Sequence, residues 1–226
     1  MEKSNDKFIR LKAIYDDAKL KKLAKSKIAV VGLGGVGSYC VAALARSGVG
    51  NLVLCDFDKV EESNINRQLF ANEETIGTKK TEIAKDYINK INSNILVSVF
   101  DEKIAVENVG EILEDLNYVV DAIDDVSAKI AIAKFCTENN IPIVSCMGTA
   151  MKTDPSKLKF ADIFETNTCP LCKNVRKLAK EAGIQKLEVL YSDEPSLKSQ
   201  NGELGSTSYL PPIAGLMLAG KVIDAI

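Results

Sequence analysis

Short, almost uninterrupted apolar runs alternate with longer amphipathic segments through the first two thirds of the chain. Apolar runs of this kind are typical of strands that are buried on both faces of a parallel sheet. The predicted strands are residues 27–31, 52–55, 95–100, 118–123 and 141–146. The predicted helices are residues 16–26, 38–47, 81–91, 106–116 and 126–138. This alternation predicts an α/β fold with a Rossmann-like, doubly wound, mostly parallel sheet.

The pattern changes after residue 146. Residues 158–164 and 187–191 alternate between apolar and polar positions, as strands with one solvent-exposed face do. We therefore expect an antiparallel C-terminal extension of the sheet, followed by a largely apolar, buried helix at 211–226. A chain of 226 residues is long enough for one substantial core, which predicts a single domain. Its expected parts are a helical arm (1–26), a nucleotide-binding core (27–148) and a substrate-side extension (149–226).

Composition and charge narrow the classes of function. The net charge of −2 provides no global positive field for nucleic acid, although a local basic face would still bind one. The chain has no histidine, which excludes Ser/His/Asp and Cys/His mechanisms and removes the commonest zinc ligand. Six cysteines without an export signal favour a reducing cytoplasm, and no apolar run is long enough to span a bilayer. We therefore expect a cytoplasmic protein without a membrane span.

A glycine-rich turn joins the first predicted strand to the helix that follows it. Gly32, Gly34 and Gly37 satisfy the pattern G-x-G-x-x-G, and Gly35 lies in the same turn. Such glycines allow a tight turn and let the backbone approach a phosphate, which then sits at the helix N-terminus. Asp56 ends the second strand, where a carboxylate accepts hydrogen bonds from ribose hydroxyls. These features fit NAD and ATP equally well, and the turn alone would also fit a structural role without a ligand.

Polar residues beyond the second strand favour ATP over NAD. Asp58 is followed by the segment NINRQLF, in which Arg67 offers a planar fork to phosphate oxygens and Asn64 and Gln68 offer amides. Lys80, at the start of a predicted helix, would bring an ammonium to a phosphate. The alternative to phosphate binding is that Arg67 forms an ion pair at the surface and that Lys80 is simply solvated.

The fourth predicted strand ends in the sequence VVDAIDD. Ligands of open α/β sheets bind outside the carboxyl ends of the strands, which places Asp124 where it can hold Mg²⁺ against phosphates. The alternative is that an aspartate here caps the next helix. We assign the metal to Asp124 and the cap to Asp125.

In order and spacing, the motifs GLGGVGS, DFDKVEESNINRQ, GTKK and DAIDD resemble those of the ATP-dependent carboxylate-adenylating enzymes related to ubiquitin activation. The resemblance covers residues 28–148 and implies a homodimer that uses ATP and Mg²⁺. It implies that Gly34 and Asp56 bind the adenosine end and Asp58 the ribose-triphosphate region. The phosphate contacts that it implies are Asn66, Arg67, Gln68 and Lys80. It further implies that Asp124 holds Mg²⁺ and that Arg10 reaches the ATP of the other subunit, so Arg10, Arg67, Lys80 and Asp124 are the implied catalytic residues.

The second half of the chain resembles one branch of these enzymes, the tRNA threonylcarbamoyladenosine dehydratases. The resemblance rests on MGTAMKTDPSKL, on the run from ADI through CPL to VRK, and on GSTSYLPPIAGLMLA. It implies adenylation of the threonyl carboxylate on the modified adenosine, followed by cyclisation with net loss of water. The alternative is adenylation of the C-terminus of a ubiquitin-like sulfur-carrier protein. A second alternative is an NAD-dependent oxidoreductase or a nucleotide-binding regulator, which would leave Arg67, Lys80 and Asp124 without a role.

One C-x-x-C pair, Cys169 and Cys172, bears on this choice. Members that activate a ubiquitin-like tail commonly carry two such pairs around a structural zinc, so we expect no zinc here. The pair itself fits two ordinary thiols at a helix start, or a bridging or redox role.

A tRNA partner requires a positive surface. Lys173, Arg176, Lys177 and Lys180 recur at helical spacing, and Lys152 and Lys157 lie near the expected rim of the site. A solvated helix face explains the first four equally well. A sulfur-relay protein is a further possible partner. The backbone carbonyls of the MGTAM turn are possible ligands of a monovalent cation.

Overall fold

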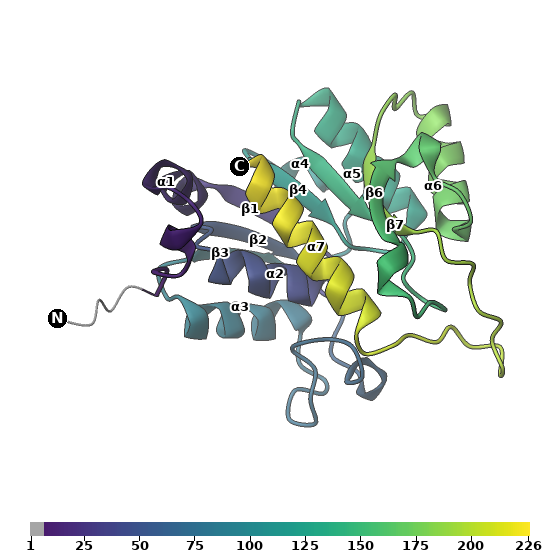
Figure 1. The fold of residues 1–226 in the computed structure, drawn as a ribbon, viewed down its shortest axis with the longest axis horizontal. Helices are drawn as coiled ribbons and strands as arrows, with labels where there is room; N and C mark the ends of the chain where they lie inside the picture. Colours follow the sequence, from purple (N-terminus) through teal and green to yellow (C-terminus); the bar gives the residue numbers. More distant parts are fainter. Residues whose placement is uncertain (1–6) are drawn as a thin grey trace.

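The computed structural model describes residues 7–226, so residues 1–6 of the predicted helical arm lie outside the described part. Seven strands form one sheet in the order β3-β2-β1-β4-β5-β7-β6 (Figure 1). The strands are β1 (Lys27–Val31), β2 (Asn51–Cys55), β3 (Leu96–Phe100), β4 (Tyr118–Asp121), β5 (Ile143–Cys146), β6 (Leu158–Asp162) and β7 (Glu188–Ser192). The α-helices are α1 (Asp17–Lys25), α2 (Gly37–Arg46), α3 (Lys80–Ile91), α4 (Val109–Ile112), α5 (Val126–Glu138), α6 (Pro170–Glu181) and α7 (Leu210–Ala225).

Both faces of the central strands are covered by helices. Ile28 and Val30 of β1 belong to a core that includes apolar residues of α2, α3 and α7. Their neighbours Ala29 and Val31 point to the opposite face and pack with residues of α4 and α5. Because neither face meets water, β1 carries no polar alternation, and the sequence pattern identified it for this reason.

The doubly wound, mostly parallel sheet is confirmed, with one difference in its extension. β7 pairs parallel with β5 and antiparallel with β6, so β6 is the edge strand and β7 is internal. Val189, Leu190 and Tyr191 are consequently buried. The expectation of one solvent-exposed face was therefore wrong for residues 187–191. This segment is too short for the alternation of its polar residues to indicate which faces of the strand are covered.

The predicted helix at 106–116 is reduced to the single turn of α4. Asn108 holds the preceding chain in a loop, since its Oδ1 accepts from the backbone N–H of Ala105 at 2.7 Å and its Nδ2 donates to the carbonyl of Lys103. Side-chain bonds of this kind compete with helix formation. Asp115, with a φ of 55°, then ends the segment. In contrast, α5 occupies the predicted residues 126–138.

α7 lies directly across α2 (Figure 1). Gly215 makes this close approach possible, because a Cβ added there would lie only 2.1 Å from the carbonyl oxygen of Val36. α7 therefore supports the residues from which α2 begins. Among residues 7–226, no helix has both the length and the apolar character needed to cross a membrane.

Candidate active site

A cavity of about 850 Å³ opens at the carboxyl ends of the parallel strands. It is lined by the loops that follow β1, β2, β4 and β5, which is the ligand position expected for this topology. The predicted residues that it brings together are Gly32, Gly34, Gly35, Asp56, Asp58, Asn64, Arg67, Gln68, Lys80 and Asp124. Three others do not line it: Gly37, Asn66 and Arg10.

The glycine loop is fixed by backbone geometry and by one carboxylate. Gly32 has a φ of +89°, and a Cβ on Gly37 would lie 1.7 Å from the Gly32 carbonyl oxygen. Asp56 holds the loop from the neighbouring strand: its Oδ2 accepts from the N–H of Leu33 at 2.6 Å, and its Oδ1 accepts from the N–H of Asp58 at 2.8 Å. Burial raises the pKa of Asp56. Both oxygens of Asp56 thus already have a backbone partner, so it organises the loop as well as facing the cavity.

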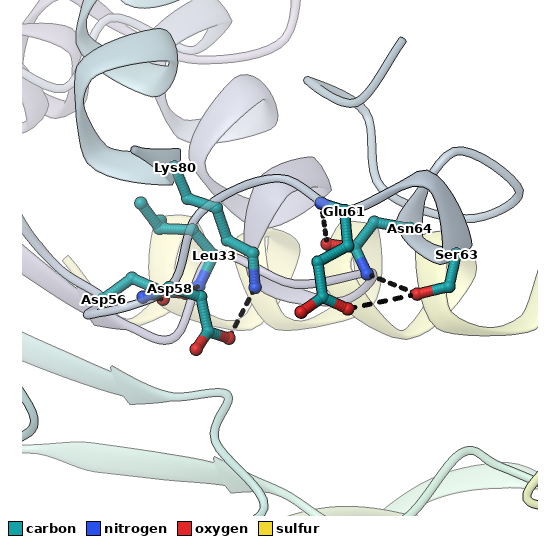
Figure 2. A network of polar contacts seen from close by, with 7 residues as sticks. All are labelled: Leu33, Asp56, Asp58, Glu61, Ser63, Asn64 and Lys80. Atoms are coloured by element: carbon teal, nitrogen blue, oxygen red, sulfur yellow. Dashed lines mark hydrogen bonds and ion pairs between the residues drawn. The ribbon is translucent and has the colours of Figure 1, made fainter. Parts of the chain in front are cut away.

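Lys80 and Asp58 form an ion pair in the cavity wall (Figure 2). Lys80 Nζ lies 2.7 Å from Asp58 Oδ2, and the backbone N–H of Lys80 donates to the Asp58 carbonyl at 3.1 Å. The Lys80 side chain is 7% exposed, against 47% for Asp58. A nearly buried ammonium at the start of α3, paired with an accessible carboxylate, is a cation that can be shared with phosphate oxygens.

The segment 64–68 is a compact turn. Asn64 closes it, because its Oδ1 accepts from the Glu61 N–H at 3.2 Å in a capping box around a short 3₁₀ helix (Glu62–Asn64) (Figure 2). Arg67 Nη1 donates to the carbonyl of Ser63 at 2.8 Å and to Asn66 Oδ1 at 2.9 Å. The guanidinium is therefore oriented before any ligand arrives.

Asn66 has a different position from the one that the resemblance implied. It is exposed and does not line the cavity, and its Nδ2 donates to the carbonyl of Ser206 at 2.9 Å. Asn66 thus connects the arginine turn to the segment that precedes α7. Asn64 and Asn66 both hold the turn in shape, and Asn64 lines the cavity together with Arg67 and Gln68.

The two aspartates after β4 have separate positions, as predicted. Asp125 caps α5 by accepting from the N–H of Ala128 at 3.0 Å, and the hydrogen bond from Lys103 lowers its pKa. Asp124 is exposed, faces the cavity and makes no hydrogen bond or ion pair with residues 7–226. Within the same residues, no three His, Cys, Asp or Glu side chains gather for a metal ion. One carboxylate suits Mg²⁺ that is held mainly by phosphates and water, because Mg²⁺ retains several such ligands.

A fully buried ion pair, which the sequence patterns did not single out, lies beneath the cavity. Lys129 Nζ is 3.0 Å from both carboxylate oxygens of Asp121 and 2.8 Å from the carbonyl of Cys146. Both side chains are 0% exposed. The pair joins the ends of β4 and β5, from which the loops with Asp124 and residues 147–151 begin. A lysine flanked on both sides by apolar residues of α5 was the signal that would have identified it.

The second wall of the cavity comes from the latter half of the chain. It includes Met147, Met151, Cys169, Leu197 and Ser206. The strand-end rule indicates residues 147–151, whereas no local pattern marks residues 196–204. The monovalent cation expected at the 147–151 turn stays a prediction.

Two of the predicted basic contacts are used inside the protein. Lys152 is 2% exposed, and its Nζ donates to the carbonyls of Ser192 and Glu194 at 2.8 and 2.7 Å. Lys152 lines the cavity, as its predicted place near the rim requires, but its ammonium already has two carbonyl partners, so its contact with a tRNA phosphate stays a prediction. Arg176 is half-buried and donates to Thr166 Oγ1 at 2.9 Å. The exposed members of the set are Lys157, Lys173, Lys177 and Lys180.

Arg10 lies far from the cavity of its own chain. It is exposed, and nearby Phe8 packs 3.5 Å from the Cβ position of Gly48, just beyond the C-terminal end of α2. That end of α2 lies toward the amino ends of the parallel strands, whereas the cavity lies at their carboxyl ends. The reach of Arg10 into another subunit therefore stays a prediction.

Comparison with known proteins identifies relatives of the whole chain. The model of the ThiF family matches residues 6–226. The tRNA threonylcarbamoyladenosine dehydratase of Bacillus subtilis is 37% identical over 223 residues, which cover 90% of this chain and 88% of the relative. The crystal structure of Escherichia coli tRNA N6-threonylcarbamoyladenosine dehydratase with ATP superimposes with a TM-score of 0.90 at 30% identity, covering 97% and 94% of the two chains. A molybdopterin-synthase adenylyltransferase of Haemophilus influenzae is 33% identical, but over 76% of this chain and 69% of its own.

Proposed function

Because the chain belongs to the ThiF family, we propose that it is an ATP-dependent enzyme that adenylates and cyclises N6-threonylcarbamoyladenosine in tRNA. The observation that carries the proposal is the cavity itself. One wall presents the glycine loop, Arg67 and Lys80, and the other is built from the half of the chain that resembles the dehydratases. ATP and a second substrate would therefore meet at the carboxyl ends of the strands.

The side chains of the first wall suit a triphosphate. Arg67 and Lys80 supply two positive groups whose positions are set by Ser63 and Asp58. Such preorganised charges stabilise the negative charge that develops when pyrophosphate leaves. Mg²⁺, held by Asp124 and the phosphates, would neutralise further charge.

The reaction depends on activation of the threonyl carboxylate more than on a side chain that acts as a general base. A carboxylate oxygen attacks the α-phosphorus of ATP, which gives an acyl-adenylate and releases pyrophosphate. A nitrogen of the same threonylcarbamoyl group then attacks the activated carbonyl, loses its proton and expels AMP, so that the nucleoside has lost one water. Because attacking nitrogen and carbonyl belong to one molecule, the second step proceeds at high effective molarity. A chain without histidine is compatible with this chemistry.

The test is to incubate the protein with ATP, Mg²⁺ and tRNA that carries threonylcarbamoyladenosine, and to analyse the nucleosides by mass spectrometry. We expect loss of one water from the modified adenosine. Lys80→Met should lower the rate on the order of 10²- to 10³-fold. Lys85→Met, an exposed lysine of the same helix, is the matched control and should leave the rate unchanged. ATP–pyrophosphate exchange that depends on a small Gly-Gly-tailed carrier protein, without reaction on tRNA, would instead support the sulfur-carrier alternative.

The assembly is part of the same proposal. A homodimer would bring Arg10 of one protomer to the ATP of the other, and a tRNA substrate supports the proposed location in the cytoplasm. The exposed Lys157, Lys173, Lys177 and Lys180 are the proposed contacts with tRNA phosphates. A sulfur-relay protein is a further proposed partner, with no surface assigned to it.

A further inference from the structure

Cys169 and Cys172 occupy the first turn of α6 at the second wall of the cavity. Cys169 is the N-cap residue, lines the cavity and is 5% exposed. Cys172 lies one turn further along and is 0% exposed, behind Cys169. Residues three apart on a helix share a face, and the Cys172 thiol is the group that most strongly lowers the pKa of Cys169. The two sulfurs are therefore neighbours, and only the first faces the cavity.

The surroundings of Cys169 favour a thiolate. The backbone N–H groups of Cys172 and Gly148 also donate to its sulfur, and the ammonium of Lys152 contributes positive charge. Together, and mainly through the bond from the Cys172 thiol, these groups hold the pKa of Cys169 below that of a free thiol. The same bond raises the pKa of Cys172.

The other cysteines in the cavity wall provide the contrast. Cys55 and Cys146 line the same cavity, but burial raises the pKa of each to about 12. Thiolates, and not thiols, are the nucleophiles of disulfide exchange. Of the cavity cysteines, Cys169 alone therefore combines access with a stabilised thiolate.

We propose that Cys169 and Cys172 form a redox-active dithiol that exchanges with low-molecular-weight disulfides entering through the cavity. The Cys169 thiolate attacks one sulfur of the disulfide, which forms a mixed disulfide and releases one thiolate. Cys172 then loses its proton and its sulfur attacks Cys169 Sγ, which releases the second thiol. In sum, the protein dithiol is oxidised to an internal disulfide and the small disulfide is reduced to two thiols. This site goes beyond the proposed adenylation, which uses neither sulfur.

The test uses the full-length reduced protein and glutathione disulfide, without ATP or tRNA, followed by intact-mass and peptide mass spectrometry. The parent protein should lose two hydrogens and retain no glutathione. Cys172→Ser should stop at a stable glutathione adduct on Cys169, because no second sulfur is present to displace it. Cys55→Ser and Cys146→Ser should behave like the parent.

A second measurement needs no variant. With limiting iodoacetamide at pH 7, Cys169 of the folded parent should be alkylated faster than every other cysteine, on the order of tenfold or more. Adducts found first on Cys55 or Cys146 would overturn the proposal, as would a Cys172→Ser protein that gains no adduct. Because no nucleotide is present, these results are independent of whether the tRNA reaction is observed.

Discussion

The Lys129–Asp121 pair gives the sharpest test of how the floor of the cavity is held. Lys129→Met keeps the length of the aliphatic stem and removes the ammonium, so that little cavity forms. Among the described residues, the Asp121 carboxylate then keeps only the hydrogen bond from the N–H of Ile123 at 3.2 Å, and the carbonyl of Cys146 loses its donor. A buried charge left without its counter-ion costs about 3–5 kcal/mol. Since domains are stable by about 5–15 kcal/mol, the loss would be a large fraction of the total.

The measurement is urea unfolding followed by far-ultraviolet circular dichroism at pH 7. We expect the midpoint of Lys129→Met to fall with little change in slope. Adding Asp121→Asn removes the unpaired charge, so the double variant should be at least about 2 kcal/mol more stable than Lys129→Met alone. Lys134→Met, which loses only an exposed pair at 3.9 Å with Glu138, should stay within about 0.5 kcal/mol of the parent. A Lys129→Met protein within about 1 kcal/mol of the parent, or a double variant no more stable than it, would refute the reasoning.

Other predictions concern packing and pH. Gly215→Ala should destabilise the protein by 1–3 kcal/mol or more, roughly as overpacking does, because its Cβ would strike the Val36 carbonyl. Gly220→Ala in the same helix meets nothing within 4 Å and should stabilise by about 0.5–1 kcal/mol in thermal unfolding. Hydrogen bonds from Lys79 and Lys103 lower the pKa values of Asp101 and Asp125. Their stabilisation is therefore present above the unfolded pKa of about 3.9 and is lost as pH falls through the lower folded values. Asp101→Asn should flatten the acid limb of a stability–pH curve, and an unchanged limb would contradict this assignment.

The parts of the fold that the sequence predicted are those governed by local periodicity. β1 and α5 were predicted at their observed residues because burial on both faces, or a cap followed by an apolar helix, leaves a direct trace in the residue order. Whether β7 is internal depends on strands that are far away in sequence. For that reason, the alternation of polar and apolar residues within 187–191 wrongly predicted a solvent-exposed face for β7.

The same distinction applies to the site. The sequence motifs after β1 and β2 identified four residues that all line the cavity: Gly32, Asp56, Arg67 and Lys80. The burial of Lys152 could not be read from its neighbours, because its partners are carbonyls about forty residues away. Long-range backbone contacts of this kind leave no periodic signal.

The crossing of α7 over α2 has a consequence for biosynthesis. The turn at Gly32 emerges from the ribosome long before Gly215, whose backbone later packs against Val36. At 5–20 residues per second, the 182 residues between the two glycines take roughly ten to forty seconds to synthesise. During that interval the apolar face of α2 has no cover from α7, so a nascent chain would present it to chaperones. Competence to bind a nucleotide would thus be acquired only after translation has delivered α7.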